Sequence, residues 1–248
     1  MKNINGNLYL DMIKGGVARL ARHKEEINAL NVFPIPDGDT GDNMLFTAKG
    51  GVSYAEKDEG GNGLSHVARA VARGMLLSAR GNSGVILSQF FEGIALGLDG
   101  FESADAQCLG AAFSRGVESA YGSVMVPTEG TVLTVMREAT EHACSIKADD
   151  VTEFLRAFVE EGKRSLLRTP DILLVLKNIS KNVIMVMGWI RCAVSLSKVT
   201  HSQKAAKLKS KLRQGHSVNQ LAPLAFPTSV IPSEKWSTMK ILSPGCES

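Results

Sequence analysis

The sequence is poor in aromatic residues, has no closely spaced cysteines and contains no long apolar run. Aromatic residues make up 6% of the 248 residues, which favours packed helices over a β-sandwich, since strands are enriched in aromatics. The four cysteines stand far apart, so neither a zinc site nor a disulfide framework is indicated, and such thiols are typical of a reducing cytoplasm. No stretch approaches the roughly 18 apolar residues of a transmembrane helix, and the N-terminus lacks a secretory signal. We therefore expect a cytoplasmic protein without an integral membrane segment.

Charge and glycine content both change sharply near Lys177. Residues 1–177 carry 18 Lys and Arg against 23 Asp and Glu, whereas residues 178–248 carry 10 against 2. Of the 24 glycines, 21 lie before the change and 3 after it. The composition predicts a folded domain over 1–177 and a divergent basic tail over 178–248, which we expect to be frameshifted or disordered. The alternative is a genuine basic tail that binds an acidic partner or a membrane surface.

Apolar residues recur with a helical period through the first domain, and no alternating strand pattern is evident. The helices that this period predicts span about 8–27, 41–55, 64–79, 85–96, 103–121, 131–146 and 149–167. The run Thr169-Pro170-Asp171 has the pattern of an N-cap, a first-turn proline and a first-turn acid, so it predicts the start of an eighth helix. The predicted fold class is all-α.

An acidic run, Asp37-Gly38-Asp39-Thr40-Gly41-Asp42, follows the first predicted helix. Carboxylates two residues apart in a tight turn can point at one centre, and hard oxygen ligands select Mg²⁺ or Ca²⁺. Counted from Asp37, the sixth and twelfth places hold Asp42 and Ala48, so the pattern is not that of an EF-hand. A magnesium site and a plain solvated turn both remain open at this point.

Three predicted helices begin at short glycine-containing turns. The first begins at Thr40-Gly41-Asp42-Asn43-Met44, the second at Gly81-Asn82-Ser83-Gly84 and the third at Gly130-Thr131. Free N–H groups at a helix start suit a phosphate, although an ordinary capped helix or a helix–helix turn has the same pattern. The chain contains neither a P-loop nor a Gly-x-Ser-x-Gly nucleophile turn.

Taken together, the segments 28–44, 79–89 and 127–135 resemble the N-terminal kinase domain of the fatty acid kinase ATP-binding subunit. That domain is similar to the L subunit of dihydroxyacetone kinase, and the resemblance covers about residues 5–177. It implies an antiparallel barrel of eight helices with a nucleotide at one rim. This chain departs from the pattern after Lys177, so the last helix is expected to be missing or altered.

The resemblance also implies a set of site residues. Asp37 and Asp39 would be ligands of two Mg²⁺ ions, and Asn31 would be a third ligand, one residue out of register with the relatives. The residues that would contact ATP are Thr40, Gly41, Asn43, Met44, Asn82, Ser83, Gly84 and Thr131. Asp42 stands where close relatives often carry a small residue, and we do not assign it as a ligand.

The function that the resemblance implies is phosphoryl transfer from ATP to a fatty acid carboxylate, which a carrier protein subunit presents, to give an acyl phosphate. A carboxylate is already ionised at neutral pH and needs no general base, which agrees with the lack of histidine in the three motifs. Two alternatives remain: a dihydroxyacetone (glycerone) kinase-like reaction, and a catalytically impaired remnant that acts as a binding module. We expect no nucleic-acid partner and leave a homodimer open.

Overall fold

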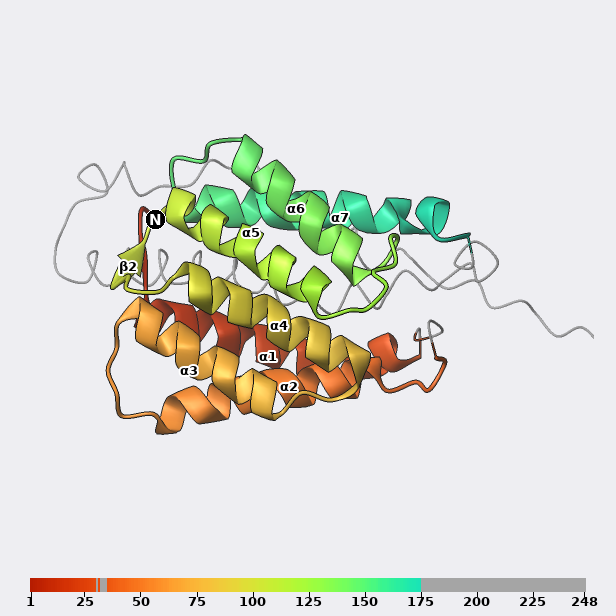
Figure 1. The fold of residues 1–248 in the computed structure, drawn as a ribbon, viewed down its shortest axis with the longest axis horizontal. Coiled ribbons are helices and arrows are strands. Elements are labelled where there is room, and N and C mark those ends of the chain that lie inside the picture. The colour runs from red at the N-terminus through yellow and green to blue at the C-terminus, as the bar shows by residue number, and fades with distance from the viewer. Residues whose placement is uncertain (30, 32–34, 175–248) are drawn as a thin grey trace, which may run out of the picture. The chain divides into compact units, whose positions relative to one another are not determined.

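The computed structural model describes residues 1–29, 31 and 35–174, all of which belong to one compact unit. The elements in chain order are β1 (Ile4–Asn5), α1 (Gly6–Asn28), α2 (Thr40–Lys57), α3 (Leu64–Leu77), α4 (Gly81–Gly97), β2 (Ser103–Ala104), α5 (Ala106–Gly122), α6 (Val132–Ser145) and α7 (Val151–Ile172). Successive helices run in alternating directions and pack side by side (Figure 1). The prediction of an all-α fold is confirmed. The predicted boundary at residue 177 and the tail beyond it lie outside the described residues.

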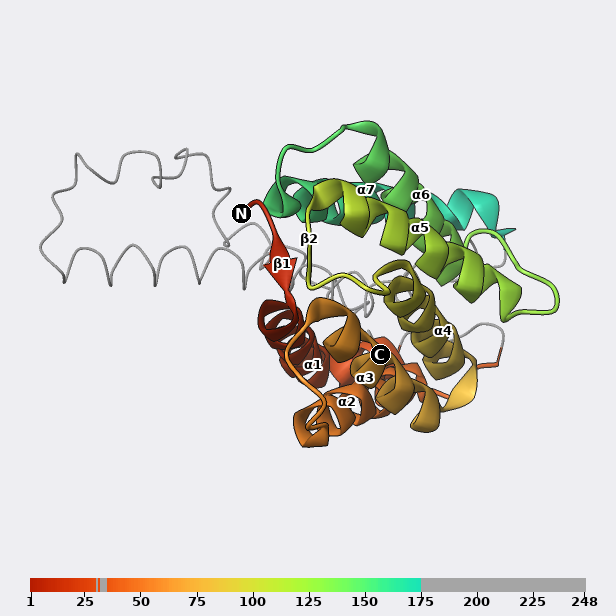
Figure 2. The same ribbon diagram turned by 60° about the vertical axis from the view of Figure 1, so that its left-hand side comes forward.

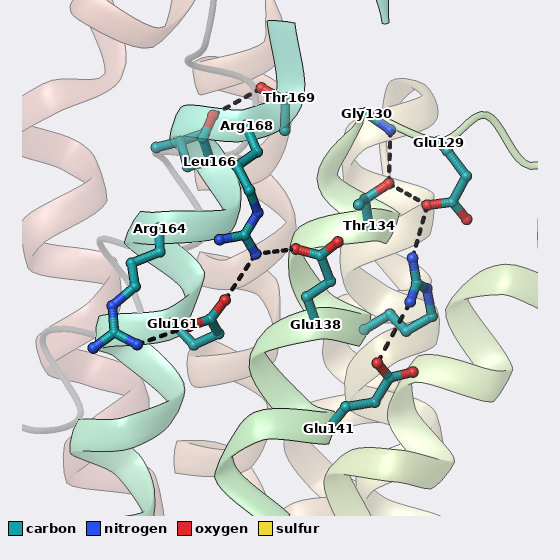
Figure 3. A network of polar contacts seen from close by, with 11 residues as sticks. Glu129, Gly130, Thr134, Glu138, Glu141, Glu161, Arg164, Leu166, Arg168 and Thr169 are labelled. Carbon is teal, nitrogen blue, oxygen red and sulfur yellow. Dashed lines mark hydrogen bonds and ion pairs between the residues drawn. The ribbon is translucent and has the colours of Figure 1, made fainter. Parts of the chain in front are cut away.

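The predicted start of an eighth helix at Thr169 is wrong, because α7 continues through Pro170 to Ile172. A proline inside a helix leaves the carbonyl four residues earlier without its N–H donor. That carbonyl belongs to Leu166, and the Thr169 hydroxyl donates to it at 2.9 Å (Figure 3). Thr169 is 1% exposed, so its hydroxyl supplies in the interior the hydrogen bond that Pro170 cannot make. The threonine before the proline therefore extends α7 instead of starting a new helix.

The N-terminal segment contains a short strand that the sequence pattern did not reveal. β1 pairs with β2 in antiparallel register, with Ile4 opposite Ala104. The terminal amino group of Met1 lies 2.9 Å from an Asp150 carboxylate oxygen, and the Met1 carbonyl accepts from the Val151 N–H at 3.0 Å. Two residues per strand are too few to show an alternating pattern. These contacts hold the chain start against the beginnings of α5 and α7.

The core between α4, α5 and α7 is built from phenylalanine rings that meet edge to face. The ring of Phe113 lies 5.7 Å from Phe90, 5.4 Å from Phe154 and 5.1 Å from Phe158. Helices α4 and α5 approach closely at Gly93, where a Cβ atom would lie 2.4 Å from the Arg115 carbonyl oxygen. Burial of these rings, and the absence of a side chain at the crossing, fix the two helices against each other.

The turns that precede α2, α4 and α6 gather at one end of the helices. Figures 1 and 2 both show these three helix starts at the end where α7 finishes, away from the N-terminus and β2. Helices of alternating direction bring every second helix start to the same end. None of the helices in the described part of the chain is long and apolar enough to cross a bilayer.

Candidate functional site

The acidic turn before α2 presents two carboxylates of different exposure. Gly38 has φ +68°, a backbone conformation that glycine adopts without strain and that separates the two aspartates. Asp37 is exposed and Asp39 is half-buried. Asn31, which is 8% exposed, donates from Nδ2 to Asp37 Oδ1 at 2.5 Å. Asn31 therefore orients Asp37 and keeps its own amide oxygen as an acceptor.

Asp39 occupies the N-cap position of α2, yet its carboxylate makes no capping hydrogen bond. The side chain of Asn28, the last residue of α1, caps the helix instead. Its Oδ1 accepts from the Gly41 N–H at 2.7 Å and from the Asp42 N–H at 3.2 Å. Both amide groups are thus already bonded, contrary to the expectation that this helix start offers them to a phosphate. The assignment of Gly41 to the nucleotide stays a prediction.

Asp42 is committed to contacts with α1. Its two carboxylate oxygens accept from Lys24 Nζ and from Asn28 Nδ2, each at 2.7 Å. The hydrogen bond from Lys24, and then the one from Asn28, hold the pKa of Asp42 below its usual value. This engagement agrees with leaving Asp42 out of the predicted metal ligands.

The first two motifs are in direct contact across α2 and α4. A Cβ atom at Gly81 would lie 2.5 Å from Asn43 Nδ2, and one at Gly84 would lie 2.5 Å from Thr47 Oγ1. Gly81 also has φ +58°, so a larger residue there would be strained as well as crowded. Ser83 is buried and Asn82 is exposed beside this contact. Two sequence segments almost forty residues apart therefore form one surface.

Two of the residues predicted to contact the nucleotide point into the protein. Met44 is 2% exposed and belongs to the hydrophobic core. Thr40, at 4% exposure, begins α2 directly after Asp39. Their roles toward ATP stay predictions.

The third turn, before α6, is fixed by its own hydrogen bonds. Gly130 has φ +81°, and its N–H donates to Thr134 Oγ1 at 2.7 Å. The Thr131 hydroxyl donates to the Thr128 carbonyl at 2.7 Å and accepts from the Leu133 N–H at 3.3 Å, so it caps α6. This turn lies at the same end of the helices as the first two motifs (Figure 2).

Glu129, in the third motif, is the centre of a polar network that sequence reasoning missed (Figure 3). Its carboxylate accepts from Thr134 Oγ1 at 2.6 Å, from Tyr121 OH at 2.9 Å and from Arg137 Nη2 at 3.0 Å. Burial raises the pKa of Glu129, but these three hydrogen bonds outweigh it and leave the pKa below its usual value. Glu129 is therefore a structural anion that holds the third turn, and it is a poor proton acceptor.

A pocket with three cationic side chains opens beside Asn43 of α2. Its volume is about 440 Å³, and its lining residues are Lys24, Asp42, Asn43, Leu45, Phe46, Lys49 and Arg80. The Arg80 guanidinium lies 3.8 Å from the centre of the Phe46 ring, a cation–π contact. The sequence analysis missed this pocket, which the spacing of Asp42, Phe46 and Lys49 on one helical face could have indicated.

The acidic turn offers oxygen donors of the kind that Mg²⁺ takes. In the part of the chain that the structure describes, no group of three or more His, Cys, Asp and Glu side chains could hold a metal ion. Asp37 and Asp39 offer two carboxylates, and Asn31 offers one amide oxygen. Mg²⁺ is usually bound by one or two carboxylates, with water and phosphate oxygens completing the shell. By their chemistry these three residues fit Mg²⁺ whose shell is completed by other oxygen ligands, and their role as metal ligands stays a prediction.

Comparison with known proteins connects this arrangement with a family. Residues 34–183, more than half of the chain, match the family described as the DAK2 domain. Protein YloV of Bacillus subtilis is 39% identical over 181 residues, which are 72% of this chain and 32% of that protein. Uncharacterized protein SSP1546 of Staphylococcus saprophyticus is 39% identical over 181 residues, which are 72% of this chain and 33% of that protein. The chain thus spans about a third of the length of these curated relatives.

Proposed function

Because the chain belongs to the DAK2 domain family, we propose that it transfers a phosphoryl group from ATP, with Mg²⁺, to the carboxylate of a fatty acid. The family is linked to kinase chemistry of the dihydroxyacetone kinase type. The fatty acid acceptor rests on the resemblance of the three motifs to the fatty acid kinase ATP-binding subunit. In this proposal a separate carrier protein presents the acyl chain.

One observation carries the proposal: the turn with Asp37 and Asp39 leads directly into a helix start that touches the second glycine-containing turn. Gly81 and Gly84 leave the space in which Asn43 and Thr47 of α2 sit. The small residues of the second turn let main-chain groups approach a phosphate, and the carboxylates before α2 suit a metal ion. Bound Mg²⁺ would neutralise negative charge on the phosphates during transfer.

The proposed acceptor needs no general base, and Glu129 of the third motif is not suited to act as one. A carboxylate oxygen of the fatty acid would attack the γ-phosphorus while the bond from that phosphorus to the bridging oxygen of ADP breaks. No proton has to be removed from the acceptor in this reaction. Glu129 has a lowered pKa and its carboxylate already accepts three hydrogen bonds, so it is poorly suited to take a proton from a hydroxyl. This argues against a sugar-like hydroxyl acceptor at that position.

The test is thermal stabilisation of the full chain by a non-hydrolysable ATP analogue, with and without Mg²⁺. We expect a Mg²⁺-dependent rise in melting temperature for the wild type, and its loss in Asp39→Asn. Asp99→Asn is the matched control, because Asp99 is an exposed aspartate that pairs with Arg69 outside the three motifs. Binding that is equally strong without Mg²⁺ would contradict the proposal. No binding by the wild type would favour the impaired remnant.

A transfer assay then separates the two acceptors. One arm supplies a fatty acid with its carrier protein, and the other supplies dihydroxyacetone with its binding subunit. Acyl phosphate in the first arm supports the proposal. Phosphate transfer in the second arm alone would instead assign a dihydroxyacetone kinase-like reaction.

A further inference from the structure

We propose that Asn28 is a positioning residue that caps α2 in place of Asp39 and thereby keeps the Asp39 carboxylate free for a metal ion. The inference rests on the proposed function, because in it Asn28 keeps the carboxylate of a proposed metal ligand, Asp39, free of a capping hydrogen bond. It concerns a residue of α1 that lies outside the acidic turn itself.

Other aspartates of this chain show what an aspartate before a helix ordinarily does. Asp105 accepts from the Cys108 N–H at 2.8 Å at the start of α5, and Asp150 accepts from the Glu153 N–H at 2.9 Å at the start of α7. In each case the carboxylate binds an amide of the first helical turn, the usual cap. Asp39 also precedes its helix, α2, but its backbone has ψ 1°, whereas Asp105 and Asp150 are extended, and it makes no such bond.

The amides that Asp39 would cap are those that Asn28 holds. Counted from Asp39, Gly41 and Asp42 are the second and third helical residues, whose N–H groups an N-cap side chain accepts. Asn28 Oδ1 accepts from both of them, at 2.7 Å and 3.2 Å. A residue of α1 therefore caps α2, and the carboxylate of Asp39 is not used for capping.

Asn28 is held in this position by further contacts at both ends of the acidic turn. Its Nδ2 donates to Asp42 Oδ2 at 2.7 Å, and its carbonyl accepts from the Asn31 N–H at 3.1 Å. The ends of α1 and α2 come close because Gly41 has no side chain, since a Cβ atom there would lie 2.3 Å from the Lys24 carbonyl oxygen. Asn28 is thus bonded both to Asn31, which orients Asp37, and to the first turn of α2, which follows Asp39.

Removal of the Asn28 side chain would leave two helix-start amides without their acceptor. In this proposal, the Asp39 carboxylate, which the positive end of the helix dipole attracts, then turns toward these amides as Asp39 adopts the extended backbone of Asp105 and Asp150. An Asp39 engaged in capping is withdrawn from a metal ion. Loss of a residue that orients a metal ligand typically costs ten- to a hundredfold in metal affinity.

The experiment measures Mn²⁺ affinity by electron paramagnetic resonance on the full chain, with a saturating non-hydrolysable ATP analogue. We expect Asn28→Ala to weaken Mn²⁺ binding by about tenfold or more. Asn5→Ala is the matched control, because Asn5 caps α1 by accepting from the Leu8 N–H and lies at the far end of that helix. It should lower the melting temperature and leave Mn²⁺ affinity unchanged. The double variant Asn28→Asp, Asp42→Asn exchanges the donor and the acceptor of the hydrogen bond between these two side chains. It should bind Mn²⁺ much more tightly than Asn28→Ala does.

A second measurement needs no metal. We expect Asp39→Ala to lower the melting temperature more in the Asn28→Ala background than in the wild type, because only there does Asp39 cap α2. Equal effects in both backgrounds, or wild-type Mn²⁺ affinity in Asn28→Ala, would overturn the role of Asn28 and leave the proposed function standing. If the wild type binds no Mn²⁺ with the analogue, both the proposed function and this inference fail.

Discussion

The end of α7 gives a sharp test of how Thr169 and Pro170 act together. Replacement of Thr169 by valine keeps the shape of the side chain and removes the hydroxyl that donates to the Leu166 carbonyl at 2.9 Å. Because Thr169 is 1% exposed, water does not readily replace the lost donor. A buried carbonyl without a partner costs about 1–3 kcal/mol of unfolding free energy.

The same carbonyl can be satisfied in a second way. In a Pro170→Ala background, the amide at position 170 regains its hydrogen and can make the ordinary helical bond to Leu166. We therefore expect Thr169→Val to cost about 1–2 kcal/mol in the wild type and less than about 0.5 kcal/mol in the Pro170→Ala background. The two substitutions are predicted to couple, although neither residue is assigned to the site.

Urea denaturation followed by circular dichroism measures the four free energies of this cycle. A loss of about 1 kcal/mol corresponds to roughly 2–4 °C in melting temperature for a chain of this size. An equal loss from Thr169→Val in both backgrounds would refute the reasoning, because the hydroxyl would then not be standing in for the missing proline amide.

Two further predictions concern the core and the third turn. Gly93→Ala should destabilise the fold, because its Cβ would lie 2.4 Å from a backbone oxygen of α5 and overpacking of up to about 3 kcal/mol exceeds the roughly 1 kcal/mol gained in helix propensity. Gly122→Ala, where a Cβ would have no neighbour within 4 Å, should not destabilise the fold in the same experiment and should stabilise it by up to about 1 kcal/mol through helix propensity. Glu129→Gln should reduce stability at pH 7. That deficit should shrink as the pH falls below about 4, because a carboxylate of lowered pKa stabilises the fold only while it is ionised. A deficit that stays constant with pH would contradict the role of Glu129 as a structural anion.

Much of the helical framework could be predicted from the sequence because the helical spacing of apolar residues is a local pattern. The buried stripe of α3, with Leu64, Val67 and Val71, recurs at helical spacing and needs no knowledge of the partner helix. The end of α7 was misassigned because Thr-Pro-Asp is a normal helix start by local rules. Only the burial of Thr169 shows that its hydroxyl points back to Leu166.

The candidate site divides in the same way. The sequence itself determined the acidic turn, because Asp37, Gly38 and Asp39 are neighbours and their geometry is set by a few backbone angles. Tertiary structure alone decided that Asn28 rather than Asp39 caps α2, and that the carboxylate of Glu129 accepts hydrogen bonds from α5 and α6. Those choices depend on how closely helices approach each other, which is fixed by packing between residues distant in the chain. Local spacing marked the acidic turn and the glycine-containing turns, and the family resemblance assigned their residues to the proposed chemistry, whereas helix packing determined which of their polar groups are already bonded.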